Sequence, residues 1–170
     1  MGKRAKEPVA PTIIEDIVVF GLRARMAPVG LQHYAADFLS VAKAVPPPNV
    51  PFAPARPYLI CHALELALKA FLSLRGRLSL EQLSDRKFGH NLQRLLAEAE
   101  RHGLNELIDV TENQKSQIER ASIYYSSKCF EYPAVGEALC AYPKMPDATV
   151  LEDTAEALIT ALREPCLHAD

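Results

Sequence analysis

Apolar residues recur along most of this chain at intervals of three and four, the spacing that predicts helices. The first clear case covers residues 31–45 and predicts an amphipathic helix. Pro46, Pro47 and Pro48 end it, because proline has no amide hydrogen to continue the helical hydrogen bonds. The face predicted to be buried holds Leu31, Tyr34, Ala35, Phe38, Val41, Ala42 and Val45.

The next helical segment, ARPYLICHALELALKAFLSLRG, covers residues 55–76 and is apolar almost all round. A helix of this kind is typical of a protein core, so we expect it at the centre of the fold. Pro57 suits its first turn, and Gly76 is predicted to end it as a left-handed cap. On a helical wheel one polar stripe lies within roughly 60°, and it is made by Tyr58, His62, Glu65 and Lys69.

Three more helices are predicted in the second half of the chain. One covers residues 90–102 and is ended by Gly103, and another begins after Thr111, which has capping-box spacing to Gln114. Asp147 caps the last helix. The buried positions are predicted to be Leu92, Leu95, Leu96 and Ala99, then Ile118, Ala121 and Tyr125, and finally Leu151, Ala155, Leu158 and Leu162.

Residues 12–26 leave two alternatives open. Thr12 and Glu15 have capping-box spacing, but the β-branched run that begins at Ile13 favours a strand. A lone strand would lack a partner, so we favour a short helix there. The whole pattern predicts an all-α protein, a single-domain bundle of about five helices over residues 29–165, after a partly flexible N-terminal segment at residues 1–28.

The composition is that of an ordinary globular domain, with 170 residues of which 49% are apolar. A formal net charge of −2 argues against broad, charge-driven binding to nucleic acid but leaves a local basic patch open. The four cysteines lack metal-type spacing, and Cys61 in the central helix indicates a buried, reduced thiol and therefore a cytoplasmic protein. No stretch approaches about 18 uninterrupted apolar residues, so we expect no contact with a membrane.

The polar stripe has two interpretations. In the first, Glu65 and Lys69 form an ordinary surface ion pair at the favourable i, i+4 spacing, and His62 shares the carboxylate. In the second, the stripe lines a cleft or a dimer interface, where Glu65 supports a positive charge on His62 and Lys69 offers a point charge to a phosphate-sized anion. What the stripe faces, whether cleft, second subunit or solvent, separates the two.

Two other segments hold candidate residues. Lys87 and His90 lie where a helix begins, and free amides of a first helical turn attract anions, although a capping role around His90 explains the same pattern. Tyr125 and Lys128 lie in an aromatic-rich segment that could stack a base and hold a phosphate, while such tyrosines more often close the end of a bundle. The candidate ligand-binding residues are therefore His62, Glu65, Lys69, Lys87, His90, Tyr125 and Lys128.

Other kinds of site are excluded by their patterns. His62 and Glu65 are three residues apart, as in di-metal bundles, but such sites need the pair twice with further carboxylates. No serine or cysteine stands in a nucleophile motif with a base, and no glycine-rich phosphate loop is present. We therefore expect no metal, no cofactor and no catalytic residue.

The segments YLICHALELALKAFL, KFGHNLQRLL and IYYSSKCFEYP together resemble the HEPN superfamily, the higher-eukaryote and prokaryote nucleotide-binding domain. The resemblance covers about residues 30–160 and implies a compact helical bundle that usually forms a homodimer. Members of the superfamily act as ribonucleases in toxin–antitoxin and defence systems. Others are non-catalytic partners that bind nucleotides or RNA, often beside a nucleotidyltransferase.

The chain departs from the nuclease members in one respect. Those members carry an arginine followed four to six residues later by a histidine, late in the bundle, whereas Arg120 is followed by no histidine before His168. Arg56 and His62 match that separation but lie at the start of the central helix. The resemblance therefore implies a non-catalytic dimeric module that binds a nucleotide, RNA or a partner protein. A metal-independent ribonuclease with His62 or His90 as general base is the alternative.

Overall fold

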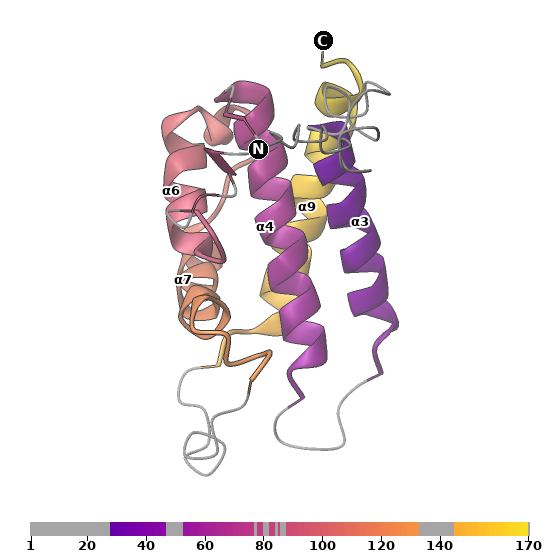
Figure 1. Cartoon of the computed structure of the whole chain (residues 1–170), viewed down its shortest axis with the longest axis vertical. Helices are drawn as coiled ribbons and strands as arrows, with labels where there is room; N and C mark the ends of the chain where they lie inside the picture. The colour runs from indigo at the N-terminus through magenta and orange to yellow at the C-terminus, as the bar shows by residue number, and fades with distance from the viewer. Residues whose placement is uncertain are drawn as a thin grey trace, which may run out of the picture.

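The computed structural model describes residues 28–46, 53–76, 78–79, 82–83, 85, 88–132 and 145–169, and these ranges contain helices and no strand. The prediction of an all-α bundle is confirmed, while residues 12–26 lie outside the described ranges. Figure 1 shows the helices α3 (Val29–Ala44), α4 (Ala55–Arg75), α6 (Leu92–Arg101), α7 (Glu112–Ser126) and α9 (Ala148–Leu167), with the short 3₁₀ turn η1 (Leu104–Glu106) after α6.

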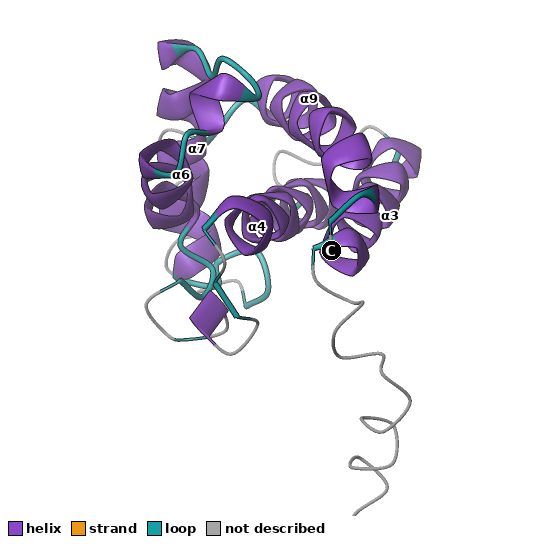
Figure 2. Ribbon diagram, turned by 90° about the horizontal axis from the view of Figure 1, so that it is seen from above, coloured by secondary structure: helices purple, strands orange, loops and turns teal. Residues whose placement is uncertain are grey.

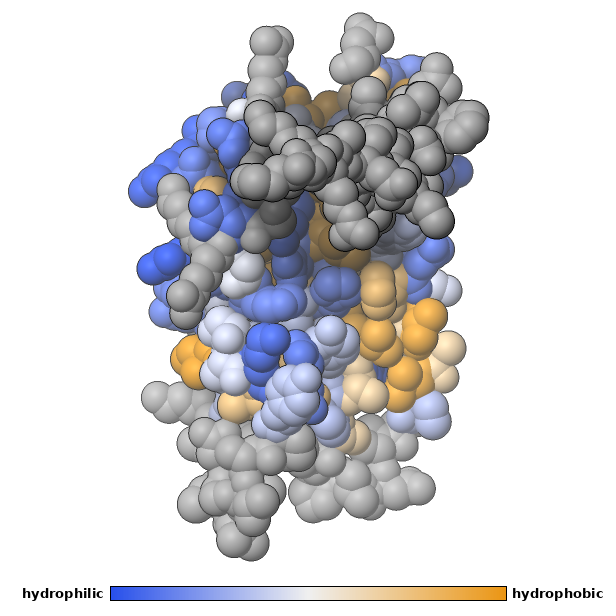
Figure 3. All heavy atoms as spheres, in the orientation of Figure 1, coloured by the Kyte–Doolittle hydropathy of each residue, from blue (hydrophilic) through white to orange (hydrophobic). Residues whose placement is uncertain are grey.

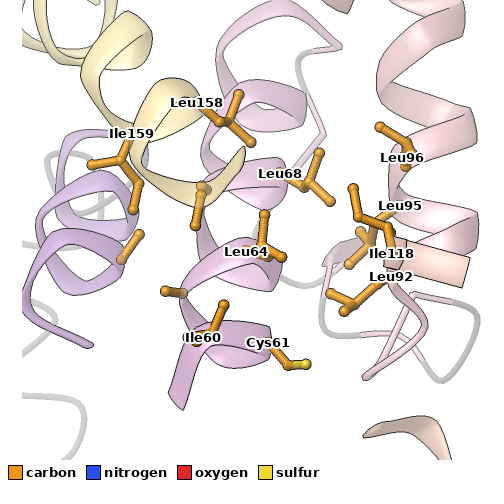
Figure 4. Packing of buried hydrophobic residues seen from close by; sticks show 14 of the residues in the cluster. Ile60, Cys61, Leu64, Leu68, Leu92, Leu95, Leu96, Ile118, Leu158 and Ile159 are labelled. Atoms are coloured by element: carbon orange, nitrogen blue, oxygen red, sulfur yellow. The ribbon is translucent and has the colours of Figure 1, made fainter. Parts of the chain in front are cut away.

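Helix α4 is the central element, as its all-round apolar sequence predicts. It contacts α3, α9, α6 and α7, and in Figure 2 it lies between α3 on one side and the α6–α7 pair on the other. Figure 4 shows Leu64 and Leu68 of α4 pointing between α9 and α6. Each such leucine, at most 1% exposed, contributes about 1.5–3 kcal/mol of transfer free energy.

By length and composition alone, α4 could also cross a bilayer, the one such helix among the described residues. More than half of its most apolar window is buried inside the bundle. The central helix of a bundle has the same composition without any membrane, because it must present apolar side chains to neighbouring helices in several directions.

The predicted capping signals begin two of the helices. Thr111 and Gln114 form a complete capping box at the start of α7, in which each side chain accepts from the other residue's backbone amide. Asp147 accepts from the amides of Thr149 and Val150 at the start of α9. The buried faces predicted for α6, α7 and α9 are confirmed residue by residue.

Gly76 ends α4, but the predicted left-handed cap is wrong. Its φ is −81° and its ψ is −9°, which any residue adopts. Glycine is needed there for space instead, because a Cβ would lie 2.8 Å from the carbonyl oxygen of Leu72. Gly103 after α6 does adopt the left-handed conformation, with φ of +85°.

The predicted apolar face of α3 is wrong at two positions. Tyr34 and Val41 are 50% and 54% exposed, whereas Leu39 and Gln32 are buried. Periodicity finds the direction of a buried face but not its edge, because the edge depends on where the neighbouring helices end. Figure 3 shows apolar side chains at the surface on the side of the molecule formed by α3.

Candidate functional site

Glu65 is the centre of a hydrogen-bonded cluster, although it belongs to the apolar helix α4 and is only 3% exposed. Its Oε1 accepts from Lys69 Nζ at 2.6 Å, and its Oε2 accepts from the Tyr125 hydroxyl at 2.6 Å. The same Oε2 lies 3.0 Å from His90 Nδ1. His62 joins through Tyr125, whose hydroxyl lies 2.8 Å from His62 Nδ1. We call these five residues the Glu65 cluster.

The cluster joins parts of the chain that are far apart in sequence. Tyr125 reaches Glu65 from α7 across 60 residues, and His90 reaches it from the turn before α6 across 25 residues. His62 and Lys69 lie one turn before and one turn after Glu65 on α4, which makes three of the five local by helix geometry. The carboxylate therefore ties the central helix to two neighbouring segments.

His90 reaches Glu65 from a strained turn. The predicted helix over residues 90–102 begins only at Leu92, because His90 has φ of +53° and Asn91 is the N-cap, accepting from the Arg94 amide. The left-handed conformation costs a residue with a side chain about 1–2 kcal/mol. The Glu65 contact and the edge-to-face packing of the His90 ring on Tyr125, with centroids 5.0 Å apart, offset that cost.

Aromatic rings from three helices surround His62. Phe38 of α3 packs edge-to-face on its imidazole with centroids 4.4 Å apart, and Tyr58, one turn earlier on α4, lies parallel to it at 6.0 Å. Tyr58 also contacts Tyr125 at 5.8 Å. These rings fix the orientation of His62, whose side chain remains 22% exposed.

The hydrogen bonds determine the charges in the cluster. Burial works to raise the pKa of the Glu65 carboxyl, but the nearby His62, whose Nδ1 lies 3.7 Å away, the hydrogen bonds from Lys69 and Tyr125 and the charge of Lys69 outweigh it and hold that pKa well below its usual range. Burial, followed by the charge of Glu65, raises the pKa of the Tyr125 hydroxyl. Glu65 is therefore ionised and Tyr125 protonated throughout the physiological range.

These charges fix the tautomers of both histidines. An ionised carboxylate can only accept, so His90 must carry a proton on Nδ1. Tyr125 gives its one proton to Glu65, so its oxygen can only accept from His62, which must also carry a proton on Nδ1. Each neutral ring thus keeps its lone pair on Nε2. Within the described ranges, neither Nε2 atom has a hydrogen-bond partner, and the two side chains are 22% and 35% exposed.

The other two candidate residues do not join the cluster. Lys128 follows α7, where it makes a left-handed turn with φ of +61° and lies 3.8 Å from Glu131. The amide of Cys129 donates to the Tyr124 carbonyl and that of Lys128 to the Tyr125 carbonyl, which is the Schellman pattern normally made by glycine. Lys87 lies outside the described ranges. Phe38 is a neighbour that sequence reasoning missed, because it comes from a different helix.

Two shallow hollows lie elsewhere, along the groove between α3 and α9, with volumes of about 450 and 310 Å³. No residue of the Glu65 cluster lines either of them. Across the described part of the chain, no group of three or more His, Cys, Asp or Glu side chains could hold a metal ion. Burial raises the pKa of the Cys61 thiol far above its ordinary value, so this cysteine is an inert core residue.

The chain matches no model of a known protein family, and comparisons with curated proteins and with solved structures also give no match.

Proposed function

We propose that this protein is a non-catalytic, HEPN-like module that binds a nucleotide or RNA through the surface above the Glu65 cluster. The observation that carries the proposal is a pair of partly exposed histidines whose Nδ1 atoms are held, one by the Tyr125 hydroxyl and the other by the buried Glu65 carboxylate. Glu65 itself has protein partners on both oxygens, so it orients its neighbours and does not meet a ligand.

The origin of the clustered groups supports the HEPN-like part of the proposal. Glu65 comes from YLICHALELALKAFL, His90 from KFGHNLQRLL and Tyr125 from IYYSSKCFEYP, the three segments on which the resemblance depends. Each segment is explained separately by helix composition, but composition does not explain why their polar residues meet at one carboxylate. Their convergence is what a shared site requires.

The surroundings of the histidines suit a base with its phosphate. Phe38 and Tyr58 flank His62, and Tyr132, in the turn after α7, is 70% exposed. Aromatic side chains stack on nucleobases at about 1–3 kcal/mol per base. Histidine Nε2 atoms are suited to the sugar or phosphate beside such a base, since they accept when neutral and donate when protonated.

The exposed apolar residues of α3 support a homodimer as part of the same proposal. Tyr34 and Val41 lie on the face of α3 that also carries Phe38, the residue that packs on His62. A second copy on this face would cover apolar side chains and complete one wall of the proposed site. Light scattering tests this. We expect the wild type to be a dimer and Val41→Glu to be a monomer, and a wild-type protein that is a monomer at about 50 µM would contradict the proposal.

Binding is tested with radiolabelled, 2′-O-methylated single-stranded RNA and with ATP, using wild type, His62→Asn and His90→Asn. Asparagine keeps a donor near the position of Nδ1 and removes Nε2, so the cluster stays intact. We expect each variant to weaken binding of ATP, whose ribose hydroxyls can donate to Nε2, about tenfold. His102→Asn is the matched control, because its side chain is also 35% exposed and lies beside a glutamate. Equal affinity in all four proteins would overturn the proposal.

A metal-independent ribonuclease is the second candidate, favoured by the two histidine Nε2 atoms that no described residue binds. One neutral imidazole would take the proton of a 2′-hydroxyl, and the other, protonated, would give a proton to the departing 5′-oxygen, leaving a 2′,3′-cyclic phosphate. Unmodified RNA incubated with the protein in EDTA tests this. Cyclic-phosphate products that His62→Asn and His90→Asn abolish would favour this candidate, and their absence would dispose of it.

A further inference from the structure

Histidine is the side chain whose charge ordinarily changes between pH 5 and pH 8, and the Glu65 cluster contains two histidines, His62 and His90. Glu65 stays ionised and Tyr125 stays protonated because of the contacts described above. Burial, with the charges of Glu131, Glu65 and Tyr132, raises the pKa of Tyr58, which therefore also stays neutral.

Among the described residues that the contacts above join to these imidazoles, the fixed charges occur in opposite pairs. On α4, Glu65 is paired with Lys69 at 2.6 Å. In the turn after α7, Glu131 is paired with Lys128 at 3.8 Å. From α3 the described contact with His62 is the uncharged Phe38 ring. With both histidines neutral the cluster carries no net charge, and each added proton makes it one unit more positive.

Any added proton must arrive at Nε2. Both Nδ1 atoms already hold a proton and donate it inward, to Tyr125 and to Glu65. The charged donor created by protonation therefore lies at Nε2, the edge that is proposed to meet the ligand. Tyr125 and the buried carboxylate occupy the Nδ1 sides of the two rings, so neither competes for the Nε2 positions.

We propose that the surface above the Glu65 cluster is a proton-linked phosphate site, in which protonation of His62 and His90 at Nε2 turns two acceptors into two cationic donors. This inference rests on the proposed function and names its ligand class and its regulation. Phosphate oxygens only accept hydrogen bonds, so a neutral Nε2 offers them nothing and a protonated one binds them. An ionised donor also roughly doubles the strength of a hydrogen bond.

The test measures the affinity of the 2′-O-methylated RNA at pH 5.5, 6.5 and 7.5 at constant ionic strength. We expect binding to tighten by about tenfold for each histidine, and so about a hundredfold in all, between pH 7.5 and pH 5.5. The His62→Asn/His90→Asn double variant should lose this dependence. A His33→Asn/His102→Asn double variant should keep it, which separates the cluster from the general rise in positive charge at acid pH.

The outcomes separate this inference from the function on which it rests. Binding at all three pH values with equal affinity, or equal pH dependence in both double variants, would overturn the proton linkage and leave the binding function intact. Absence of RNA binding at every pH would overturn both. Long-range proton–nitrogen NMR spectra at pH 8 give an independent readout, since both rings must show the Nδ1–H tautomer, and an Nε2–H tautomer in either would contradict the argument.

Discussion

Replacing Glu65 by glutamine tests whether the buried carboxylate holds the cluster together. The side chains are nearly equal in size, so no cavity is created. Glutamine, however, presents one amide nitrogen where the carboxylate presented a second acceptor. Turned one way, that nitrogen faces the Lys69 ammonium; turned the other way, it faces the hydroxyl of Tyr125 and the imidazole of His90, which then lose the acceptor for their protons.

The magnitude follows from burial. Glu65 has a side chain that is 4% exposed and its partner Lys69 one that is 13% exposed, so neither charge is well solvated. Removing one member of a buried, hydrogen-bonded pair costs about 3–5 kcal/mol, because the other charge is left without a partner. Lys69 retains some solvent and can move toward it, so we expect about 3 kcal/mol. At about 2–4 °C per kcal/mol for a chain of this size, the melting temperature should fall by roughly 6–12 °C.

Lys43 and Glu156 provide the control, since they form an ion pair between α3 and α9 at 2.7 Å, with side chains 37% and 56% exposed. Exposed pairs contribute about 0–1 kcal/mol, so Glu156→Gln should be almost silent. Urea denaturation followed by circular dichroism at 222 nm measures both variants. If Glu65→Gln cost no more than Glu156→Gln, the cluster would not be a stabilising element, and the charge assignments built on it would be wrong.

Lys128→Gly is expected to stabilise the protein by about 0.5–1 kcal/mol in urea denaturation, because glycine adopts φ of +61° without steric cost; unchanged stability would count against strain at this turn. Gly76→Ala is expected to destabilise by about 1–3 kcal/mol, since its Cβ would lie 2.8 Å from the Leu72 carbonyl, and a neutral thermal shift would show that this contact relaxes freely. The stability difference between wild type and Glu65→Gln is expected to shrink below about pH 5. The pKa of Glu65 is lower in the folded state than in the unfolded chain. The ionised carboxylate therefore stabilises the fold fully at pH values above its unfolded pKa, and this stabilisation is lost as the pH falls toward its folded pKa. A stability difference between the two proteins that stays constant from pH 7 to pH 3 would contradict this.

The elements that could be predicted from the sequence are those fixed by local pattern. The capping box of Thr111, the buried stripes of α6, α7 and α9 and the central position of α4 all depend on residues within a few turns of one another. Gly76 shows the limit, because its role depends on how closely the chain passes the carbonyl of Leu72 and not on its own φ. Close approach leaves no periodic signal.

The candidate site was predictable in part for the same reason. The stripe of His62, Glu65 and Lys69 is a property of one helix, and wheel geometry finds it. His90 and Tyr125 were separate candidates in the sequence, but no local pattern indicates that both meet Glu65. The sequence also leaves open which residue of the stripe is buried, and it is the carboxylate, at the side of α4 that faces α7.

A buried carboxylate in an otherwise apolar helix is poorly explained by stability alone. Replacing a buried ion pair by apolar residues of similar size is often neutral or stabilising, by about 1–4 kcal/mol, because it avoids the cost of removing charges from water. We therefore expect a Glu65→Leu/Lys69→Leu/Tyr125→Phe variant to unfold within about 2 kcal/mol of wild type. The same variant should lose RNA affinity and its pH dependence, because nothing then holds the Nδ1 protons of the two histidines.

That variant separates the two explanations of the cluster, and denaturation and RNA binding are measured on the same preparation. If the triple variant folds but no longer binds RNA, the role of the carboxylate is to orient His62 and His90. If the triple variant does not fold, the role of Glu65 is structural, and it is needed to set the position of α4 against α7. Retained, pH-dependent binding would show that the histidines find their orientation without Glu65, most simply through the aromatic rings of Phe38 and Tyr58.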